Sequence, residues 1–592
     1  MNKKYLLQLI CIATSLFCFS SCIKDDIPGS EEDAFQKPAD ENVIPADYNA
    51  NLLAEIPQEI FMNAFTEMDV KMGLIQEAQL SIHDVHATPH AYQVQFSTLI
   101  DNYAGYFVAP QDFSGRLVST SYLCNQFRDG PYGCFLNVKN NVTPLLYDSR
   151  TNALPEFRAM CLVIYSLAAQ EVTDIYGSIP YNDFKHNVES HPFTYMKGMA
   201  IYDSIVVDLD KSIAVFEHFN MRPDWHKTAI NTILAKQDKL LDGTIESWKR
   251  LANSLKLRMA LHIVEVDPIK AKKWAEEAVA SGVIEAGNRE AYVDPGKEFS
   301  AQHPLFFIAR LWKDTRLNAS FESIMESLNL PTKEVLFTTN KGKIYDHEGH
   351  LALNDEEDLE DFDNPTNPRM VGIRAGVPMK PRSDDNTYLN YSYLGDKFSS
   401  ECVYLFRMSE CYFLRAEGAL RGWNMQGTAQ DLYEQGILKG YVAPSYYSNR
   451  WEQRYAKRYM SLTKANDYTY VDPHNSRWNH ESVTKIGVKW DDTASKEIKL
   501  EQIITQKWVF NFPNSIESWT ELRRTGFPMT FPILFVTDGD GSLSDGDMIR
   551  RIPFAAVQDA EKADVLSTGI PSLGGPNTQA TRLFWDTDAP AI

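Results

Sequence analysis

The amino-acid sequence predicts a mainly α fold, and three observations lead to this prediction. Apolar residues recur at the 3.6-residue spacing of amphipathic helices over much of the chain. At one such stripe, Asp267 is a suitable N-cap, Pro268 suits the first turn and Gly282 suits the exit. Hydrophobic residues make up 44% of the 592 residues and charged residues 23%, which suits a folded protein with a large core rather than a disordered or polytopic membrane protein.

The first element is a secretory signal peptide, predicted over residues 1–21. Two lysines precede an apolar run that is too short to span a membrane and that ends in small polar residues. Phe19-Ser20-Ser21-Cys22 resembles a bacterial lipobox, in which the cysteine is acylated and becomes the first residue. An ordinary signal peptide with a chance cysteine is the alternative. Residues 22–44 are acidic and rich in proline and small polar residues, so we expect a flexible tether before a large domain over 45–592.

Amphipathic stripes predict the helices in the first half of this domain. Each stripe places its apolar residues at offsets of three, four or seven, so that they share one helical face. The stripes are Phe61, Ala64, Phe65, Met68, Met72 and Ile75; Phe157, Met160, Cys161, Ile164 and Ala168; Tyr202, Val206, Leu209, Ile213 and Phe216; Trp248, Leu251, Ala252, Leu255 and Met259; and Ala271, Trp274, Ala275, Ala278 and Val279.

The second half alternates two loop-rich parts, 286–400 and 441–500, with a further pair of predicted helices. A turn over 422–427 separates two stripes that contain small residues: Met408, Cys411, Tyr412, Ala416 and Ala419, then Ala429, Leu432, Tyr433 and Gly436. Two helices joined by a short loop, with small residues toward the partner, resemble a tetratricopeptide unit. Because no clean 34-residue repeat is visible, we expect isolated helix pairs rather than a continuous solenoid.

Charge and composition limit the classes of partner. The chain has 58 Lys and Arg against 79 Asp and Glu, a formal net charge of −21, which opposes binding to the phosphate backbone of a nucleic acid. Aromatic residues make up 12%, so some rings are expected at a binding surface. Beyond Cys22 the number of cysteines is odd and no CxxC occurs, which argues against a disulfide framework, although Cys124 and Cys134 lie close enough in sequence to pair.

Five segments, in order, resemble those of the SusD-like (SusD/RagB) outer-membrane nutrient-binding lipoproteins. They are 173–181 (TDIYGSIPY), 248–260 (WKRLANSLKLRMA), 409–417 (SECYFLRAE), 506–508 (QKW) and 517–528 (ESWTELRRTGFP). The ordered set of segments, together with the lipobox, resembles this family far more specifically than any one segment does. The resemblance implies a single large α-rich domain, in which tetratricopeptide-like helix pairs form a scaffold and a loop-rich part binds the ligand.

The same resemblance implies a function. It indicates a lipid-anchored outer-membrane protein, facing the cell exterior, that captures an oligosaccharide and delivers it to a TonB-dependent, SusC-like transporter without catalysis or a cofactor. A peptide ligand is the close alternative, because the family includes peptide binders as well as glycan binders. Two rivals of other classes are a surface glycoside hydrolase and a structural tetratricopeptide adaptor.

Motifs for chemistry are weak throughout the sequence. It contains no GxSxG, GxxxxGK, GxGxxG or HExxH, so no catalytic residue is predicted, although a pair of glycosidase carboxylates leaves no local motif. His83, His86 and His90 could form a zinc site, but Pro89 is expected to break the helix between them. A calcium loop at Asp538, Asp540 and Ser542 lacks the turn glycine, replaced by Leu543, and the bidentate glutamate, replaced by Ile549. No metal site is therefore expected.

Several charged residues fall on otherwise apolar helices and are predicted to pair in the interior. Arg258, Glu410, Arg415 and Glu417 lie within such stripes, where a charge needs a partner. Arg523-Arg524 could bind phosphate, but we expect this pair to satisfy carboxylates and carbonyls.

The candidate ligand site is the segment 386–396, which interleaves aromatic rings with polar groups. Rings cover the apolar C–H face of a sugar while amides and carboxylates bind its hydroxyls. An edge strand with ordinary packing fits the same alternation equally well. The candidate residues in this segment are Tyr388, Asn390, Tyr391 and Tyr393. Weaker candidates, for which core roles are expected, are Trp312, Tyr122 and Tyr132.

Overall fold

The computed structural model describes residues 53–68, 71–112, 119–124, 126–340, 369–379, 386–440, 451–536, 539–555, 559–588 and 592. The predicted signal peptide, Cys22 and the tether lie outside the described residues. Among the residues described, none of the helices has the length and apolar character needed to cross a membrane.

The described chain is mainly helical, which confirms the predicted fold class. Its longer helices are α3 (Gln58–Met68), α4 (Gly73–Ser81), α7 (Gly130–Tyr147), α8 (Pro155–Tyr176), α10 (Gly198–His218), α11 (Asp224–Gln237), α12 (Ile245–His262), α13 (Pro268–Ser281), α16 (Ala319–Ser327), α18 (Met408–Leu420), α19 (Ala429–Lys439), α22 (Lys496–Asn511) and α23 (Ser515–Thr525). Short helices include α5 (His90–Tyr92), α6 (Ile100–Tyr103), α9 (Tyr181–Lys185), α14 (Pro295–Phe299), α15 (Pro304–Phe307), α17 (Lys333–Leu336), α21 (Lys457–Tyr459), α24 (Asp559–Asp564) and α25 (Ile570–Leu573).

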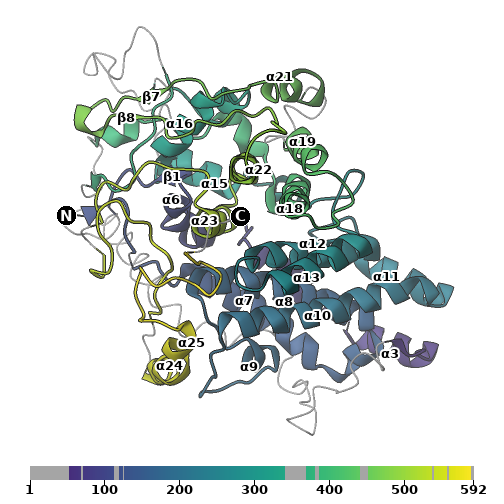
Figure 1. Ribbon diagram of the computed structural model, residues 1–592. Coiled ribbons are helices and arrows are strands. Elements are labelled where there is room, and N and C mark those ends of the chain that lie inside the picture. Colours follow the sequence, from purple (N-terminus) through teal and green to yellow (C-terminus); the bar gives the residue numbers. More distant parts are fainter. Residues whose placement is uncertain are drawn as a thin grey trace.

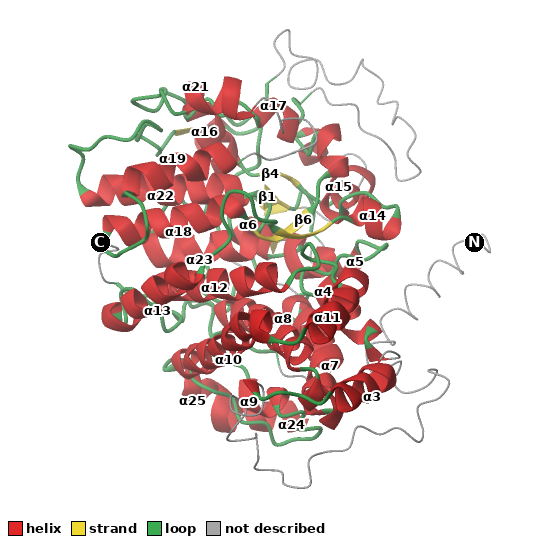
Figure 2. Cartoon of the chain, turned by 90° about the vertical axis from the view of Figure 1, so that its right-hand side faces the viewer, coloured by secondary structure: helices red, strands yellow, loops and turns green. Residues whose placement is uncertain are grey.

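Strands are few and short. Among the described residues they form four antiparallel pairs, most of which join segments far apart in sequence, and Figure 2 shows β1, β4 and β6 among the helices. The pairs are β1 (Phe107–Val108) with β4 (Arg316–Leu317), β2 (Ser119–Thr120) with β5 (Pro378–Met379), β3 (Ala291–Val293) with β6 (Val403–Phe406), and β7 (Thr469–Tyr470) with β8 (His480–Glu481).

Paired helices form the scaffold. Helices α7, α8, α10, α12 and α13 lie side by side in the lower half of Figure 1, and each packs on the next. In the upper half, α18 packs on α19 and α22, and α12 contacts α18. The helix pair predicted at 408–436 is therefore confirmed as α18 with α19. The helices predicted at 248–259 and 271–279 are α12 and α13, which also pack on each other.

Local chemistry explains where the helices begin and end. Asp267 accepts a hydrogen bond from the Lys270 N–H at 3.0 Å, and Gly282 follows α13 with φ of 110°, as the sequence predicted. Helix α8 is buried at every position, which is the pattern of a central helix that other helices cover on all sides. It ends at Gly177, whose φ of 88° suits glycine.

Several elements differ from the sequence prediction, and two of them show the reasons. The stripe from Phe61 to Ile75 is divided between α3, which ends at Met68, and α4, which begins at Gly73. The part 286–400, predicted as loops, contains α16, in which Asn318 accepts a hydrogen bond from the Ser320 N–H at 2.8 Å. Its apolar residues follow too few turns for periodicity to reveal them, whereas the cap and tertiary burial stabilise it.

The described residues form one large core and one small one. The small core contains Val108, Ala319, Val371, Ile373, Val377, Met379, Tyr391, Tyr470 and Phe531. These residues come from short strands, from loops and from the first position of α16, and this small core supports the surface considered next.

Candidate ligand-binding surface

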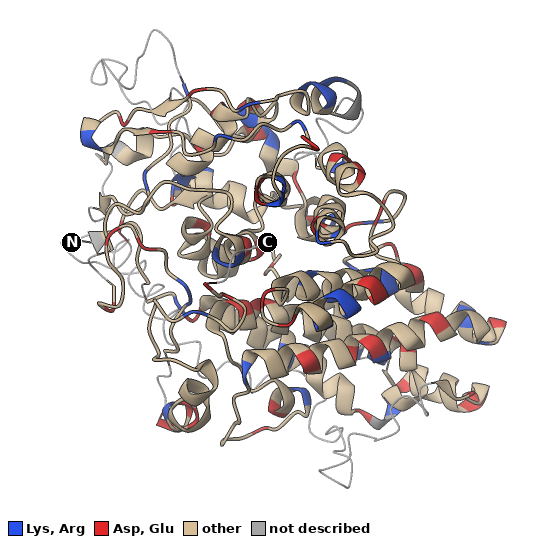
Figure 3. Ribbon diagram, in the orientation of Figure 1, with Lys and Arg blue, Asp and Glu red and all other residues tan. Residues whose placement is uncertain are grey.

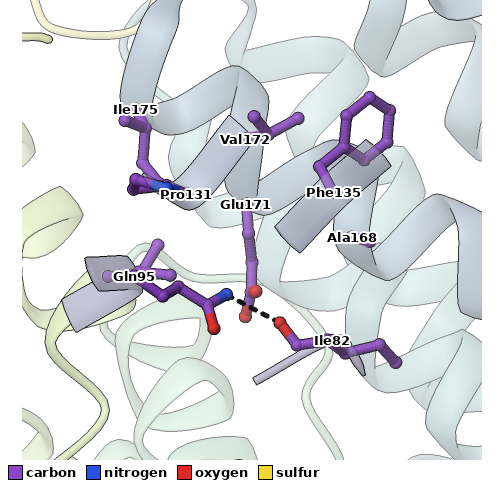
Figure 4. Close-up of a pocket in the computed structure, with 9 residues that line it drawn as sticks. Ile82, Gln95, Pro131, Phe135, Ala168, Glu171, Val172 and Ile175 are labelled. Atoms are coloured by element: carbon purple, nitrogen blue, oxygen red, sulfur yellow. Dashed lines mark hydrogen bonds between the residues drawn. The ribbon is translucent and has the colours of Figure 1, made fainter. Parts of the chain in front are cut away.

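Two small cavities open within the described part of the chain, and neither has room for a sugar or a peptide. One lies between α4, α7 and α8 and has a volume of about 10 Å³, the space of about one water. Figure 4 shows Gln95, Glu171 and Ile82 around it, and the Gln95 amide donates to the Ile82 carbonyl at 2.7 Å. His83 also contacts Glu171 at 2.9 Å, whereas the Gln95 Oε1 atom is buried and accepts no hydrogen bond from the residues that the structure describes. A ligand site is therefore to be sought on the surface.

Three partly exposed aromatic rings on the small core are the candidate ligand-binding surface. Three rings, those of Tyr388, Tyr468 and Trp478, pack against the small core and remain partly exposed. We call these three residues the aromatic surface. Tyr388 lies in the 3₁₀ helix Thr387–Asn390, Tyr468 precedes β7, and Trp478 ends the 3₁₀ helix Ser476–Trp478. Residues about 90 positions apart in sequence are thus brought onto one small core.

Ring contacts connect the surface to its support. Tyr388 packs on Tyr391 with ring centroids 5.4 Å apart, and Tyr391 packs on His474 at 5.8 Å. His474 is exposed, so the ring series runs from the loop of Tyr388 to the loop that leads into Trp478. Rings held in this way lose little conformational entropy when a ligand stacks on them.

Hydrogen bonds fix the loop that carries Trp478. Asp472, buried beneath this loop, accepts the His474 and Asn475 N–H groups at 2.9 Å each and the Tyr470 hydroxyl at 2.9 Å. Arg374 donates to the Trp478 carbonyl at 2.7 Å. The loop is therefore a preorganised platform rather than a free coil.

A buried carboxyl group holds the third ring. The Tyr468 hydroxyl donates to Glu322, and the Gly372 N–H donates to the other carboxyl oxygen of Glu322 at 2.5 Å. Burial raises the pKa of Glu322 to about 7, although both hydrogen bonds act to lower it. The side chain thus positions Tyr468 from beneath the surface.

The structure divides the predicted residues of the 386–396 segment. Tyr388 and Asn390 are half-buried and reach the surface, whereas Tyr391 is 0% and Tyr393 is 4% exposed. Tyr391 is part of the small core, and the guanidinium groups of Arg310 and Arg316 lie 4.7 Å and 5.2 Å from the Tyr393 ring centroid. Neither buried ring can offer a face to a ligand in this structure. The candidate site therefore no longer includes Tyr391 and Tyr393, which were predicted to bind the ligand.

The weaker candidates lie on other elements. Tyr122 is 2% exposed, and its hydroxyl accepts the Ile549 N–H at 3.2 Å, so its role is in the core. Trp312 is half-buried against Phe307, with ring centroids 5.3 Å apart. Tyr132 is half-buried on α7 against Tyr176 at 5.8 Å. Trp312 and Tyr132 pack on the large core, so the structure does not join them to the aromatic surface.

Sequence reasoning missed Tyr468, His474 and Trp478. Their signal is the same mixture of rings, amides and an acid that marks 386–396, here in the order Tyr468, Tyr470, Asp472, His474 and Trp478. The segment 441–500 was predicted to be loop-rich, but nothing local showed that it meets the 386–396 segment. Among the described residues, the two segments meet at the small core.

The candidate metal residues are engaged with protein groups. Asp538 lies outside the described residues, and Asp540 accepts hydrogen bonds from the Ser542 N–H at 3.0 Å and the Gln579 N–H at 2.7 Å. His83 contacts Glu171, whereas His86 contacts Glu77 and Asp84, so these two histidines have different partners. Cys124 and Cys134 are both free thiols.

One buried group of potential metal ligands, His262, Glu517 and Glu521, already holds a cation. The Lys507 ammonium lies 2.6 Å from Glu517 and 3.1 Å from Glu521. The neighbouring carboxylates raise the pKa of His262 to about 9 against the effect of burial, so this imidazole is itself positive at neutral pH. These charges belong to an internal ion-pair network.

That network confirms the predicted roles of most of the charged helix residues. Arg258 pairs with Glu410 at 2.7 Å, and Arg524 pairs with Glu417 at 2.7 Å. Arg415 lies 3.4 Å from Glu285. Arg523 donates to carbonyl groups at 2.8 Å and 3.2 Å, and its guanidinium stacks 3.6 Å from the Trp519 ring centroid, so this arginine pair binds the protein itself.

The sequence and the fold both match known proteins. A family model described as "SusD-like: Susd and RagB outer membrane lipoprotein" matches residues 49–586. A solved structure of a chitin-binding SusD homologue from Flavobacterium johnsoniae is 30% identical with a TM-score of 0.73, and the match covers 88% of this chain and 100% of that chain. A SusD homologue from Bacteroides thetaiotaomicron is 26% identical with a TM-score of 0.71, over 88% and 99% of the two chains. No curated protein matches this chain.

Proposed function

Because this chain belongs to the SusD-like family of outer-membrane lipoproteins, we propose that it captures an oligosaccharide at the cell surface and delivers it to a TonB-dependent transporter without catalysis. The observation that carries the proposal is the aromatic surface, with three half-buried rings on one rigid core. Such rings stack on the apolar C–H faces of sugars.

Polar groups beside these rings supply hydrogen bonds for sugar hydroxyls. Asn390 is half-buried next to Tyr388, and His474 and Asn479 are exposed on the loop of Trp478. Amides and imidazoles can both donate and accept, as a hydroxyl-rich ligand requires. The chemistry of the surface therefore suits a neutral glycan better than an anionic one, in keeping with the acidic chain.

Fragments of chitin are the first ligands to test. The solved structure that is 30% identical to this chain is described as chitin-binding. N-acetylglucosamine units have an apolar ring face and an amide, and the aromatic surface with its neighbouring amides offers complements to both.

The central experiment is calorimetric titration of the protein with chitin fragments and other glycans, alongside Tyr388→Ala and Trp478→Ala. Losing a stacking ring should cost about 1 to 3 kcal/mol of binding free energy, which is roughly a 5- to 150-fold rise in Kd. Tyr292→Ala is the matched control, because Tyr292 is also half-buried and packs on one tyrosine, with ring centroids 5.2 Å apart, but lies on β3. The affinity of the Tyr292→Ala variant for the glycan should equal that of the wild type.

Two results would contradict the site. One is unchanged glycan affinity in both variants with native melting temperatures, and the other is an equal loss in the Tyr292→Ala control. Saturable binding of peptides in place of glycans, with the same dependence on Trp478, would keep the surface and select the peptide alternative. Formation of shorter glycan products by the purified protein would instead favour the glycoside hydrolase alternative.

Delivery to a transporter requires a protein partner. A binder held on the cell surface cannot by itself move its ligand inward, so the family assignment supports a SusC-like β-barrel partner. Affinity capture of this protein after mild detergent extraction should recover such a barrel in near-equal amount. Recovery of this protein alone, under conditions that preserve other such complexes, would favour a free-standing binding protein.

A further inference from the structure

A buried carboxyl group lies where α6 meets the turn between α22 and α23. Asp101, on α6, is 1% exposed. The Ser515 hydroxyl, at the start of α23, donates to Asp101 Oδ1 at 2.7 Å, whereas Oδ2 makes no hydrogen bond to the residues that the structure describes. Figure 1 shows α6 and α23 side by side near the middle of the molecule, and the two helices contact each other.

Asp101 differs from the carboxylates of the ion-pair network in having no cation beside it. Charges of both signs are interspersed over the helices (Figure 3), and in the network Lys507 and His262 both contact Glu517. Within the described part of the chain, no ion pair includes Asp101. A charge in the interior is costly unless an opposite charge or a proton neutralises it.

The electrostatics of Asp101 agree with this geometry. Burial raises the pKa of Asp101 to about 7, and the groups that act against this rise are the hydroxyls of Ser515 and Ser97. Because neither hydroxyl carries a charge, the described residues leave the carboxylate without a counter-ion. The first turn of α23 favours the charged form of Asp101, and the last turn of α22 favours a cation nearby.

Two asparagine side chains of the same turn add buried oxygen atoms. Asn511 is the last residue of α22 and is 2% exposed, and Asn514, which precedes Ser515, is 9% exposed. The Asn514 N–H donates to the Asn511 carbonyl at 2.7 Å, so both residues are held in the turn that carries Ser515. Their Oδ1 atoms accept no hydrogen bond from the described residues. Carboxylate and amide oxygens are the ligands that hard cations take.

We propose that Asp101, Asn511 and Asn514 bind a monovalent cation, either sodium or potassium. One carboxylate matches one positive charge, whereas a divalent ion would bring a second charge that no described residue balances. The ion would join α6 to the turn between α22 and α23. Helix α6 leads into β1, and Val108 of β1 belongs to the small core, so the ion would stabilise the support of the aromatic surface without contacting a ligand.

The test is the melting temperature of the whole protein at pH 8 in choline chloride, in which choline is replaced stepwise by sodium, potassium, magnesium or calcium at constant ionic strength. At this pH a carboxyl group with a pKa of about 7 is mainly charged. Sodium or potassium should raise the melting temperature along a saturable curve, because each binds the folded state. The ion that reaches half-saturation at the lower concentration is the preferred one.

The decisive variant is Asp101→Asn, which keeps the size of the side chain and removes the carboxylate. It should abolish the saturable rise in melting temperature. The control is Asp224→Asn, the same change on α11 at a side chain that is 98% exposed, and it should keep the rise. If Asp101→Asn does not fold, as judged by circular dichroism, Asn514→Ala replaces it and should raise the cation concentration at half-saturation.

Three results would overturn the cation site. They are the absence of a saturable rise with both sodium and potassium, a rise with magnesium or calcium alone, and an equal response of the site variant and the Asp224→Asn control. Each of these results leaves the glycan proposal intact, because the aromatic surface does not include Asp101 or the two asparagines.

Discussion

His262 shows at the residue scale how a buried side chain takes its properties from its neighbours. Its Nε2 lies 3.2 Å from Glu517 and its Nδ1 lies 3.3 Å from Asp174, and the residue is 0% exposed. These two carboxylates raise its pKa from 6.5 to about 9, so the folded state binds a proton more tightly than the unfolded state. The stabilisation is complete below about pH 6.5 and is lost as the pH rises through about 9.

We therefore predict that His262→Gln destabilises the protein most at low pH. The difference from the wild type in free energy of unfolding should be largest below pH 6.5 and should fall by about 1 kcal/mol or more per pH unit between 6.5 and 9. Urea unfolding of the variant and the wild type at pH 6, 7.5 and 9.5 measures this difference in free energy. His90→Gln, at an exposed residue of α5, is the control and should follow the wild-type curve. A difference that does not change with pH would refute the proposed charge of His262.

At the scale of elements, close packing explains the small residues in the paired helices. Gly436 of α19 faces α18, and a Cβ atom at this position would lie 2.5 Å from the Phe413 ring. Phe413 is 0% exposed and stacks parallel to Phe510 with ring centroids 6.3 Å apart, so it has little room to move. The sequence placed Gly436 on the facing stripe, but only the packed pair shows the closeness of the contact.

Gly436→Ala should consequently destabilise the protein by about 1 to 3 kcal/mol through overpacking, even though alanine favours helix formation. Gly133→Ala is the matched control, because Gly133 lies within α7 and an added Cβ there would have no atom within 4 Å. The control should be stabilised by about 0.5 to 1 kcal/mol. Equilibrium unfolding in urea measures the free energy of unfolding of both variants. Equal changes at Gly436 and Gly133 would contradict the packing argument.

At the scale of the whole molecule, contacts of very long range join the last part of the chain to helix α8. The Trp585 indole donates to Asp174 at 2.7 Å, and the Ile552 N–H donates to the Ile175 carbonyl at 3.1 Å. The last part of the chain therefore packs on the central helix α8, which is buried on every side. Such contacts indicate that the helices and the loop-rich parts fold around shared cores rather than as separate units.

Attachment to the membrane is also a property of the whole molecule. We predict that Cys22 is acylated, so that Cys22→Ala releases the protein into the soluble fraction. Each buried CH₂ of an acyl chain contributes about 0.8 kcal/mol, so two or more chains hold the protein firmly. Fractionation after a salt wash, with Cys18→Ala as the control within the predicted signal peptide, tests this. Membrane association of the Cys22→Ala protein would show that the anchor is elsewhere.

The sequence by itself determined the scaffold helices α8, α10, α12, α13, α18 and α19, the pairing of α18 with α19, and the need for partners at Arg258 and Glu410. These features follow from spacing along one helix, from caps such as Asp267 and from the cost of burying an unpaired charge. Only the tertiary structure decided that Tyr388 reaches the surface while Tyr391 belongs to a core. It also decided that Trp478 packs on the same small core as Tyr388. Those outcomes depend on which distant segments cover each ring, and local periodicity carries no information about that packing.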